Sequence, residues 1–236
     1  MKYCFCTIAI GENYYNSAIN FAKKLNTLSN SHHYIIVTDN IIEEIPNTTF
    51  FSIPTDEVLF IGNFFNYNLK YYPIKCANEM GFDYIIFVDS DWKIKDTYDE
   101  KSINKLFEFM DNKNFDFLFE RPHLIGNGKH DGNQSFWRHK IEFYNLLDTN
   151  IYDNGHVVNE QFLVFKTNEK LKLFINEWEK LKNIATSNNL WPFAEGVEIG
   201  MSSALSNMNG NYAEWEQFVK NFFQFETIDG RIYDRF

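Results

Sequence analysis

Two aspartates, one residue apart, are the side chains in this sequence best placed to bind a metal ion. They follow the apolar run from Tyr84 to Val88, whose β-branched and aromatic residues are typical of a strand buried on both faces. Ligands of open α/β sheets bind beyond the carboxyl ends of such strands. Asp89 and Asp91 therefore offer hard oxygen donors suited to Mg²⁺ or Mn²⁺, and the ion could in turn hold a diphosphate. The alternative interpretation of Asp89-Ser90-Asp91 is a turn or a helix cap.

Strand-like and helix-like patterns alternate around this motif and predict an α/β fold. We expect a single domain, residues 1–236, built as a three-layer α/β/α sandwich with a central mixed, mainly parallel sheet. The apolar residues at helical spacing from Tyr14 to Leu28 are interpreted as a core stripe. The polar segment 121–134 predicts a long loop, which is either a functional lid or a plain surface loop. The expected strands are 2–10, 33–38, 49–53, 84–88, 115–120 and 157–165, and the expected helices are 14–28, 66–80, 102–112, 135–147, 169–183 and 213–225.

Composition and charge exclude some classes of protein. The chain has 236 residues, of which 44% are hydrophobic, and this is enough for a substantial core. The net charge is −10 and no cluster of Lys and Arg stands out, so a nucleic-acid binder is disfavoured. No apolar run reaches the roughly 18 residues of a transmembrane helix, and the N-terminus lacks a signal-peptide pattern. We expect Cys4, Cys6 and Cys76 to be buried, reduced thiols of a cytoplasmic protein.

An α/β half that ends in an apolar run and Asp-x-Asp, followed by a less regular half with acidic residues, resembles the glycosyltransferases of the GT-A fold. The resemblance covers about residues 2–200 and rests mainly on the two aspartates. It implies a nucleotide-binding half, 1–120, and an acceptor-side half, 121–236. The resemblance places the donor nucleotide at Thr7, Ile8, Ala9, Thr38, Asp39, Lys75, Asp89 and Ser90.

The family often brings a basic side chain toward the nucleotide from the helix before the motif, and a late His to the metal. Lys75 matches the basic residue best and Lys70 second, although Lys75 is equally well explained as a solvated helix lysine. The sequence departs from the pattern at the late His, because its last one is His156. We take His156 as the candidate third ligand, and the alternative is that diphosphate oxygens and waters complete the coordination of the ion.

Acidic residues beyond the motif are candidates to activate or position the acceptor. Glu195 and Glu198 lie near Trp191, whose aromatic face could stack on a sugar ring, and Glu160 lies at the start of an expected strand. The alternative for Glu195 and Glu198 is a place in the first turn of a helix, where carboxylates interact favourably with the helix dipole. The resemblance and these residues together give Glu198, Glu195 and Glu160 as the candidate catalytic residues.

The predicted activity is metal-dependent transfer of a hexose from a nucleoside-diphosphate sugar to an acceptor hydroxyl, with Mn²⁺ or Mg²⁺ as the cofactor. UDP is the nucleotide that the resemblance implies most strongly. One alternative is a non-catalytic carbohydrate-binding protein on a degenerate transferase fold. Another is a nucleotidyltransferase of similar fold, although Gly11-Glu12-Asn13-Tyr14 lacks the glycine-rich, basic loop that such enzymes carry. A phosphohydrolase of the haloacid-dehalogenase kind is disfavoured, because that family carries Asp-x-Asp on its first strand. The oligomeric state is left open.

Overall fold

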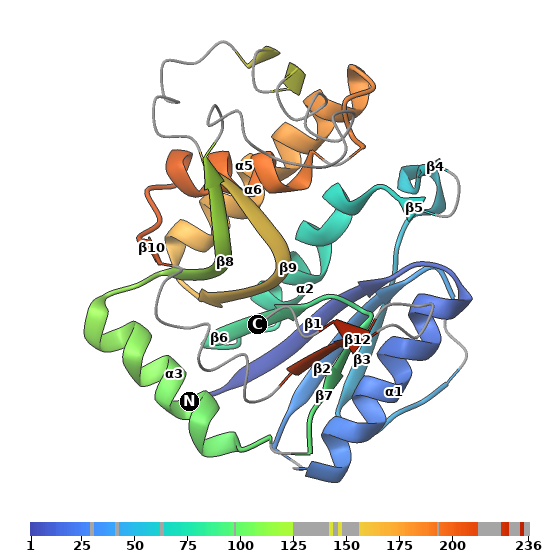
Figure 1. Cartoon of the computed structure of the whole chain (residues 1–236), viewed down its shortest axis with the longest axis vertical. Coiled ribbons are helices and arrows are strands. Elements are labelled where there is room, and N and C mark those ends of the chain that lie inside the picture. Colours follow the sequence, from blue (N-terminus) through green and yellow to red (C-terminus); the bar gives the residue numbers. More distant parts are fainter. Residues whose placement is uncertain are drawn as a thin grey trace.

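The computed structural model describes most of the chain, and Figure 1 draws its ribbon. The described residues are 1–28, 31–40, 43–61, 64–96, 98–124, 142–143, 146–147, 156–192, 194–211, 223–226 and 232–233. The backbone alone is described at 61, 64, 120–124, 156–157, 159–160, 211, 223–226 and 232–233.

Strands and helices alternate along the chain, as the sequence pattern predicts. The strands are β1 (Tyr3–Ala9), β2 (His33–Thr38), β3 (Thr48–Ser52), β4 (Phe60–Ile61), β5 (Phe64–Phe65), β6 (Tyr84–Val88), β7 (Trp92–Ile94), β8 (Phe117–Leu124), β9 (His156–Lys166), β10 (Gly210–Asn211), β11 (Phe223–Glu226) and β12 (Ile232–Tyr233). The α-helices are α1 (Glu12–Leu28), α2 (Tyr71–Glu79), α3 (Glu100–Lys113), α5 (Glu169–Ser187) and α6 (Glu195–Leu205). Short 3₁₀ helices are η1 (Thr55–Glu57) and η2 (Tyr67–Lys70).

In the part of the chain that the structure describes, a seven-stranded sheet has the order β10-β8-β9-β6-β1-β2-β3. Strands β1, β2, β3 and β6 run parallel to one another, whereas β9 runs antiparallel to both of its neighbours, β6 and β8 (Figure 1). The mixed, mainly parallel sheet expected from the sequence is therefore confirmed. Strands β7, β11 and β12 form a separate antiparallel sheet that the sequence pattern does not predict.

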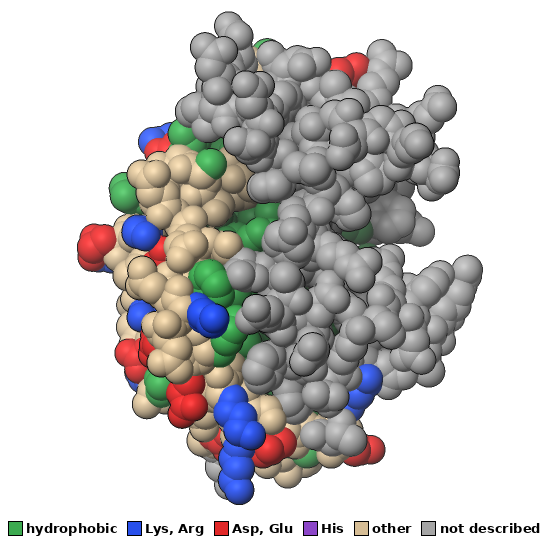
Figure 2. Space-filling view, turned by 60° about the vertical axis from the view of Figure 1, so that its left-hand side comes forward, with side chains coloured by type: hydrophobic (Ala, Val, Ile, Leu, Met, Phe, Trp, Pro, Cys, Tyr) green, Lys and Arg blue, Asp and Glu red, His purple; other side chains and the backbone are tan. Residues whose placement is uncertain are grey.

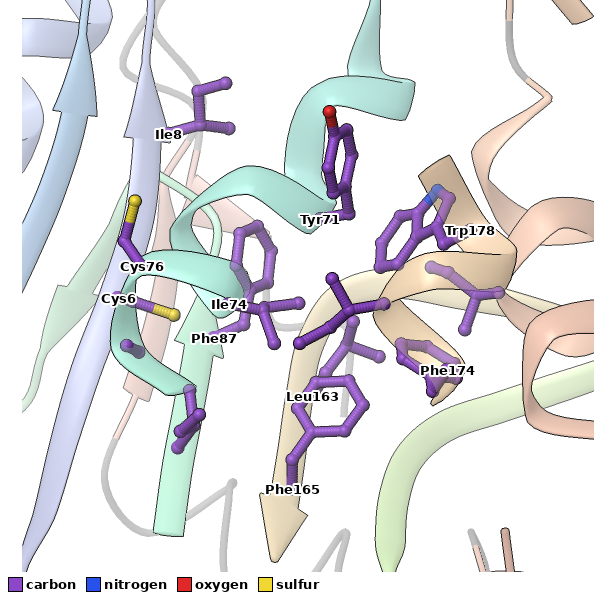
Figure 3. Close-up of a cluster of buried hydrophobic side chains, with 14 of the residues drawn as sticks. Cys6, Ile8, Tyr71, Ile74, Cys76, Phe87, Leu163, Phe165, Phe174 and Trp178 are labelled. Atoms are coloured by element: carbon purple, nitrogen blue, oxygen red, sulfur yellow. The ribbon is translucent and has the colours of Figure 1, made fainter. Parts of the chain in front are cut away.

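Alternate side chains of the main sheet pack into two cores, because successive residues of a strand point to opposite faces. In β6, Tyr84 and Ile86 join side chains of α1 and α3 on one face. Ile85 and Phe87 join side chains of α2 and α5 on the other face. Figure 3 shows side chains of this second core, with Tyr71 and Ile74 from α2 and Phe174 and Trp178 from α5. Helices on both faces confirm the three-layer α/β/α arrangement.

Polar caps set the bounds of the helices that flank the middle strands. The Asp99 carboxylate accepts a hydrogen bond from the Lys101 backbone N–H at 3.1 Å and begins α3, as is usual for an N-cap aspartate. Asn114 ends α3 in the left-handed conformation, with φ of 56°. The Asn168 side chain accepts from the Leu171 N–H at 3.1 Å and begins α5. The helix bounds therefore follow from local hydrogen bonding as well as from apolar spacing.

Two expected elements differ from the observed ones at their ends. The expected helix 66–80 divides into η2 and α2, and Pro73 lies in the first turn of α2, where its missing N–H costs no hydrogen bond. The sequence-based prediction starts the loop 121–134 too early, because residues 121–124 still belong to β8 and pair with the start of β9. This last part of β8 is polar and lacks the alternation of apolar residues by which a strand is recognised in sequence. Residues 125–134 lie outside the described part of the chain.

The expected helices 135–147 and 213–225 fall largely outside the described residues. Residues 142–143 and 146 are helical, in agreement with the first of them. Residues 223–225 belong instead to β11 and pair with β7, so the end of the second prediction is wrong. Backbone pairing with a distant strand is invisible to helical periodicity in a short segment.

The predicted state of the cysteines is confirmed, since Cys4, Cys6 and Cys76 are buried free thiols. Across the described helices, none has both the length and the apolar character that a membrane crossing requires. Figure 2 shows one face on which acidic and basic side chains of the described residues are intermixed. The expectation that nucleic acid is not a partner stays a prediction.

Candidate functional site

The Asp-x-Asp triplet forms a turn at the carboxyl end of β6. The Asp89 backbone N–H donates to the Gln161 carbonyl at 2.9 Å, so β9 still pairs with the chain at this point. The Trp92 N–H donates to the Asp89 carbonyl at 3.1 Å and closes the turn into β7. Trp92 is buried and stacks on Phe162, with ring centroids 5.6 Å apart. The turn interpretation is correct for the backbone, and it leaves both carboxylates at the end of the strand, where the site is expected.

A buried lysine neutralises the first of these carboxylates. The Lys70 Nζ lies 2.7 Å from Asp89 Oδ1, and only 4% of the lysine side chain and 18% of the aspartate side chain is exposed. The ammonium group also lies 5.0 Å from the centroid of the Tyr67 ring, within range of a cation–π interaction. Because Lys70 ends η2 just before α2, this element carries the cation to the carboxyl end of β6.

Two tyrosines lie beside the acidic turn. The hydroxyl groups of Tyr14 and Tyr67 are hydrogen-bonded to each other, and Phe65 packs edge-on against both rings. Burial raises the pKa of Tyr14, and the negative charges of Asp91 and Asp89 raise it further. Tyr14 thus belongs to the neighbourhood of the acidic turn, although its spacing alone suggests a core residue. The signal that could have found it is its place in the first turn of α1, directly after the carboxyl end of β1.

The loops after β1 and β2 are held together by the predicted Thr-Asp pair. The Asp39 carboxylate accepts from the Gly11 N–H at 3.0 and 3.2 Å, and Gly11 has a φ of +83° that favours glycine. The Thr38 hydroxyl hydrogen-bonds with the backbone of Asn40. This pair therefore shapes the edge at which the parallel strands end.

The side chains at the end of β1 lie in the interior. Thr7 and Ala9 are fully buried and Ile8 is 2% exposed. These side chains support the strand, and only backbone groups at its end remain to contact a nucleotide. A nucleotide contact at these three positions stays a prediction.

Of the two candidate lysines, Lys70 and not Lys75 reaches the acidic turn. The Lys75 Nζ lies 3.2 Å from Glu179 Oε2 on α5, and both side chains are about one-third exposed, at 35% and 36%. The two lysines are five residues apart on consecutive helical turns, and η2 points only the earlier one toward β6. Lys70 is therefore the better placed of the two lysines, and a contact of Lys75 with nucleotide stays a prediction.

Glu198 lies in the interior between α5, α6 and η2. It is fully buried, and its carboxyl group accepts from Trp178 Nε1 at 2.8 Å and from Asn68 Nδ2 at 3.4 Å. Burial raises the pKa of Glu198 well above its ordinary value. A carboxyl group that is enclosed and hydrogen-bonded through both oxygens does not fit a base that must meet an acceptor. We therefore assign Glu198 to the support of η2 instead of to catalysis.

Glu195 lies near Tyr67, which is also close to the acidic turn. Both glutamates fall in the first turn of α6, as the alternative interpretation proposes, and Glu195 is 1% exposed. Burial and the neighbouring Tyr14 raise the pKa of Tyr67, and the charges of Asp89 and Glu195 add to this effect. These effects indicate that Tyr67 lies near both Asp89, at the end of β6, and Glu195, at the start of α6.

The start of β9 supplies backbone to the same edge of the sheet. Gln161 bonds with Asp89 as described above, so Glu160 is the next residue beyond the end of β6. His156 lies five residues before Gln161, which is roughly 16 Å along an extended strand. This separation argues against His156 as a ligand to an ion at Asp89. The side chains of Glu160 and His156 lie outside the described part of the structure.

The described residues contain no group of three or more His, Cys, Asp or Glu side chains that could hold a metal ion. Asp89 and Asp91 form only a pair, but both offer carboxylate oxygens, the donor type that a hard divalent cation prefers. An ion there would need oxygen ligands from a bound anion or from water. Trp191 is partly buried near the start of α6, and the neighbouring Phe193 lies outside the described residues.

The order of the strands and the acidic turn at the end of β6 define the class of fold, and the comparisons agree with it. No protein-family model and no curated protein matches the sequence. Among solved structures, the chain is similar to galactosyltransferase LgtC in complex with donor and acceptor sugar analogs, with a TM-score of 0.53 and 11% identity over 90% of this chain and 73% of that one. It is also similar to core-mannan synthase A (CmsA/Ktr4) from Aspergillus fumigatus in its Mn/GDP form, with a TM-score of 0.50 and 10% identity over 94% and 74% of the two chains. The chain therefore has the GT-A glycosyltransferase fold that the sequence predicts.

Proposed function

We propose that this protein is a glycosyltransferase that moves a sugar from a nucleoside-diphosphate sugar to an acceptor hydroxyl. The observation that carries the proposal is the acidic turn at the carboxyl end of β6, with Asp89 and Asp91 beside the buried cation of Lys70. This is the edge of an α/β sheet where ligands bind. The two structures named above, one with Mn and GDP and one with donor and acceptor sugar analogs, support the proposal through the shared fold. UDP and a hexose are the proposed donor components.

In this proposal Asp89 and Asp91 hold Mn²⁺ or Mg²⁺, and phosphate oxygens and waters complete the coordination. The ion supplies a positive charge for the leaving diphosphate. Lys70 adds a second positive charge from the protein, because its short reach to Asp89 places it beside any phosphate held there.

Other side chains position the sugar and the acceptor. We keep Glu195, in the first turn of α6, and Glu160, next to Gln161 at the start of β9, as candidates to position the sugar or the acceptor. Tyr14 and Tyr67 stay protonated at neutral pH because burial raises the pKa of each, so they act as hydrogen-bond donors and not as bases. Between the two carboxylates, Glu160 is the better candidate to meet the acceptor, since Glu195 is almost fully enclosed.

The experiment that tests the proposal combines binding with product analysis. Melting temperatures are measured with a panel of nucleoside diphosphates and nucleotide sugars, with and without Mn²⁺, because a ligand of the native state raises the melting temperature. Release of nucleoside diphosphate from the stabilising donor is then followed in the presence of candidate acceptors. We expect one nucleotide to stabilise the protein in the presence of metal, and Asp89→Asn to abolish both effects.

The matched control is Asp96→Asn, which makes the same change on the other side of β7 at a side chain that is 90% exposed. This variant should bind and turn over donor as the wild type does. Donor binding without any transfer would favour the non-catalytic carbohydrate-binding protein. Release of pyrophosphate from a nucleoside triphosphate and a sugar phosphate would identify a nucleotidyltransferase. The absence of any nucleotide effect would refute the donor site.

A further inference from the structure

The Lys70 ammonium group contacts Asp89, one of the two carboxylates proposed to hold the metal. We infer that Lys70 competes with the metal for Asp89, so that the metal binds weakly to the ligand-free protein and tightly once a nucleoside diphosphate is present. This inference deepens the proposed function and rests on it for the identity of the nucleotide. The competition itself rests on the ion pair alone.

The geometry of the pair sets up the competition. The Lys70 Nζ lies 2.7 Å from Asp89 Oδ1, which is the distance of a charge-assisted hydrogen bond. A Mg²⁺ ion binds carboxylate oxygen at about 2.1 Å. An ion on the same carboxylate would therefore lie within a few ångströms of the ammonium group, in surroundings that exclude most water. Repulsion between the two cations weakens metal binding for as long as Lys70 stays in place.

The segment that carries Lys70 is fixed, so the competition involves the side chain and not a loop that moves away. Asn68, two residues earlier in η2, is fully buried and donates to Glu198. It also accepts from Asn66 Nδ2 at 3.1 Å. The Lys70 side chain packs near the rings of Tyr67 and Phe87. Lys70 can therefore leave Asp89 only by rotation of its own flexible stem.

A diphosphate at this edge gives the ammonium group another anion within reach. When Lys70 turns from Asp89 to a phosphate oxygen, Asp89 is released for the metal, and the phosphates add oxygen ligands of their own. The two ligands then favour each other's binding, and the coupling is reciprocal by thermodynamic linkage. Nucleotide raises the affinity for metal by the same factor by which metal raises the affinity for nucleotide.

The test measures Mn²⁺ binding directly, by the loss of the electron paramagnetic resonance signal of free Mn²⁺. Wild type and Lys70→Met are titrated with Mn²⁺ alone, and again in the presence of UDP or GDP. We expect the nucleotide to tighten Mn²⁺ binding to wild type about tenfold or more, within the usual range of coupling between sites. Without nucleotide, Lys70→Met should bind Mn²⁺ about tenfold more tightly than wild type, and the effect of nucleotide on it should be smaller.

The matched control is Lys182→Met. Lys182 is also buried, and its Nζ lies 2.7 Å from Glu57 Oε2, so the change removes a comparable ion pair elsewhere. This variant should bind Mn²⁺ as wild type does. If Lys70→Met does not fold, Lys70→Gln replaces it, since an amide can still donate to Asp89 without a charge. Lys70→Arg keeps the charge and should keep the weak binding of Mn²⁺.

The outcomes separate this inference from the proposed function. Equal Mn²⁺ affinities of wild type and the neutral Lys70 variants without nucleotide would overturn the competition, even if the protein transfers sugar. Equal gains in Lys70→Met and Lys182→Met would also overturn it, because the effect would then reflect net charge. Tighter Mn²⁺ binding by the neutral Lys70 variants alone supports the competition, even if no nucleotide binds and the transferase proposal fails.

Discussion

The molecule contains two buried lysines in similar ion pairs, and only one of them lies where chemistry is expected. Lys70 contacts Asp89 and Lys182 contacts Glu57, each at 2.7 Å, with 4% and 10% of the lysine side chains exposed. Each ammonium group also faces an aromatic ring, that of Tyr67 in the first case. By distance, burial and aromatic contact the two pairs are nearly equivalent.

The difference lies in what surrounds the carboxylate. Asp89 ends a central strand and is followed two residues later by Asp91, with Glu195 nearby on α6. Glu57 lies on η1, and its pair with Lys182 links that turn to α5. Lys182 joins two elements of the scaffold, and the charges of Glu57 and Glu198 also lie near it. The place of the Lys70 pair at the carboxyl end of a central strand, and not an excess of negative charge, therefore distinguishes the two pairs.

The largest difference should appear in turnover. Asp89→Asn is expected to lower transfer by about 100-fold or more, because it removes charge that holds a cation at the leaving group. Glu57→Gln should keep turnover within about threefold of wild type, because Glu57 belongs to the scaffold. A lower free energy of unfolding still leaves folded molecules, and these stay active. Initial rates at saturating donor and metal, with the folded fraction checked by circular dichroism, would decide this. Similar losses in both variants would remove the distinction between the two pairs.

The next effect concerns stability and its recovery by metal. Lys70→Met and Lys182→Met should each lower the free energy of unfolding by about 2 kcal/mol, which is less than for a fully enclosed pair because the carboxylate partners are partly exposed. Mn²⁺ should restore the melting temperature of Lys70→Met, because the ion takes the place of the ammonium group. It should leave that of Lys182→Met unchanged. Recovery of both variants, or of neither, would contradict the comparison.

A pH effect should come from Glu198, which lies between the two regions. Its folded pKa is raised by burial, so the protonated form is favoured in the native state. Its contribution to stability is complete below its ordinary pKa of 4.5 and is lost as the pH rises through the folded pKa, since the unfolded chain releases the proton first. Glu198→Gln should therefore gain stability relative to wild type as the pH increases from 4.5.

Urea unfolding between pH 4.5 and pH 8 would measure this gain. Each unit by which the folded pKa exceeds the unfolded one is worth about 1.4 kcal/mol in the limit. Glu169→Gln is the control, because that side chain is 85% exposed and should show no such trend. A constant difference between Glu198→Gln and wild type across this range would show that the pKa of Glu198 is the same in the folded and unfolded states.

The smallest effect is expected at the exposed pair of Lys75 and Glu179. Lys75→Met should change the free energy of unfolding by less than about 1 kcal/mol, as is usual for surface ion pairs. It should leave nucleotide and Mn²⁺ binding unaltered, because Lys75 points to α5. Weaker nucleotide binding in this variant, measured by calorimetry, would restore the sequence-based preference for Lys75 over Lys70.

Sequence patterns predict the main sheet well, because its signal lies in continuous buried runs. The run that ends at Val88 and the segment 33–38 are found at nearly the positions observed. Strand β7 is missed because it is short and pairs only with residues far along the chain. The turn at Asp89 is likewise closed by backbone bonds that leave no pattern in side-chain type.

The site is predicted less completely than the fold. Asp89 and Asp91 stand out because they follow a buried strand, whereas Lys70 and Lys75 look alike in sequence. Only the boundary between η2 and α2 decides which of the two reaches the acidic turn, and helix periodicity does not resolve a single 3₁₀ turn. Glu198 is indistinguishable from an exposed helix-terminal carboxylate until α5 is known to cover it.

The antiparallel strand β9 also has a consequence for the order in which the molecule folds. The β1–β2 and β2–β3 pairs join segments that are close in sequence, so these contacts form after short loops close. In the described sheet, strand β6 pairs only with distant partners, with β1 through Ile85 and Cys4 and with β9 through Val88 and Phe162, and both contacts must wait until far longer loops have closed. During synthesis, the acidic turn is therefore made early but receives its backbone partner from β9 only after most of the chain has emerged. We therefore expect the charged edge of the sheet to become rigid only after β9 has paired with β6.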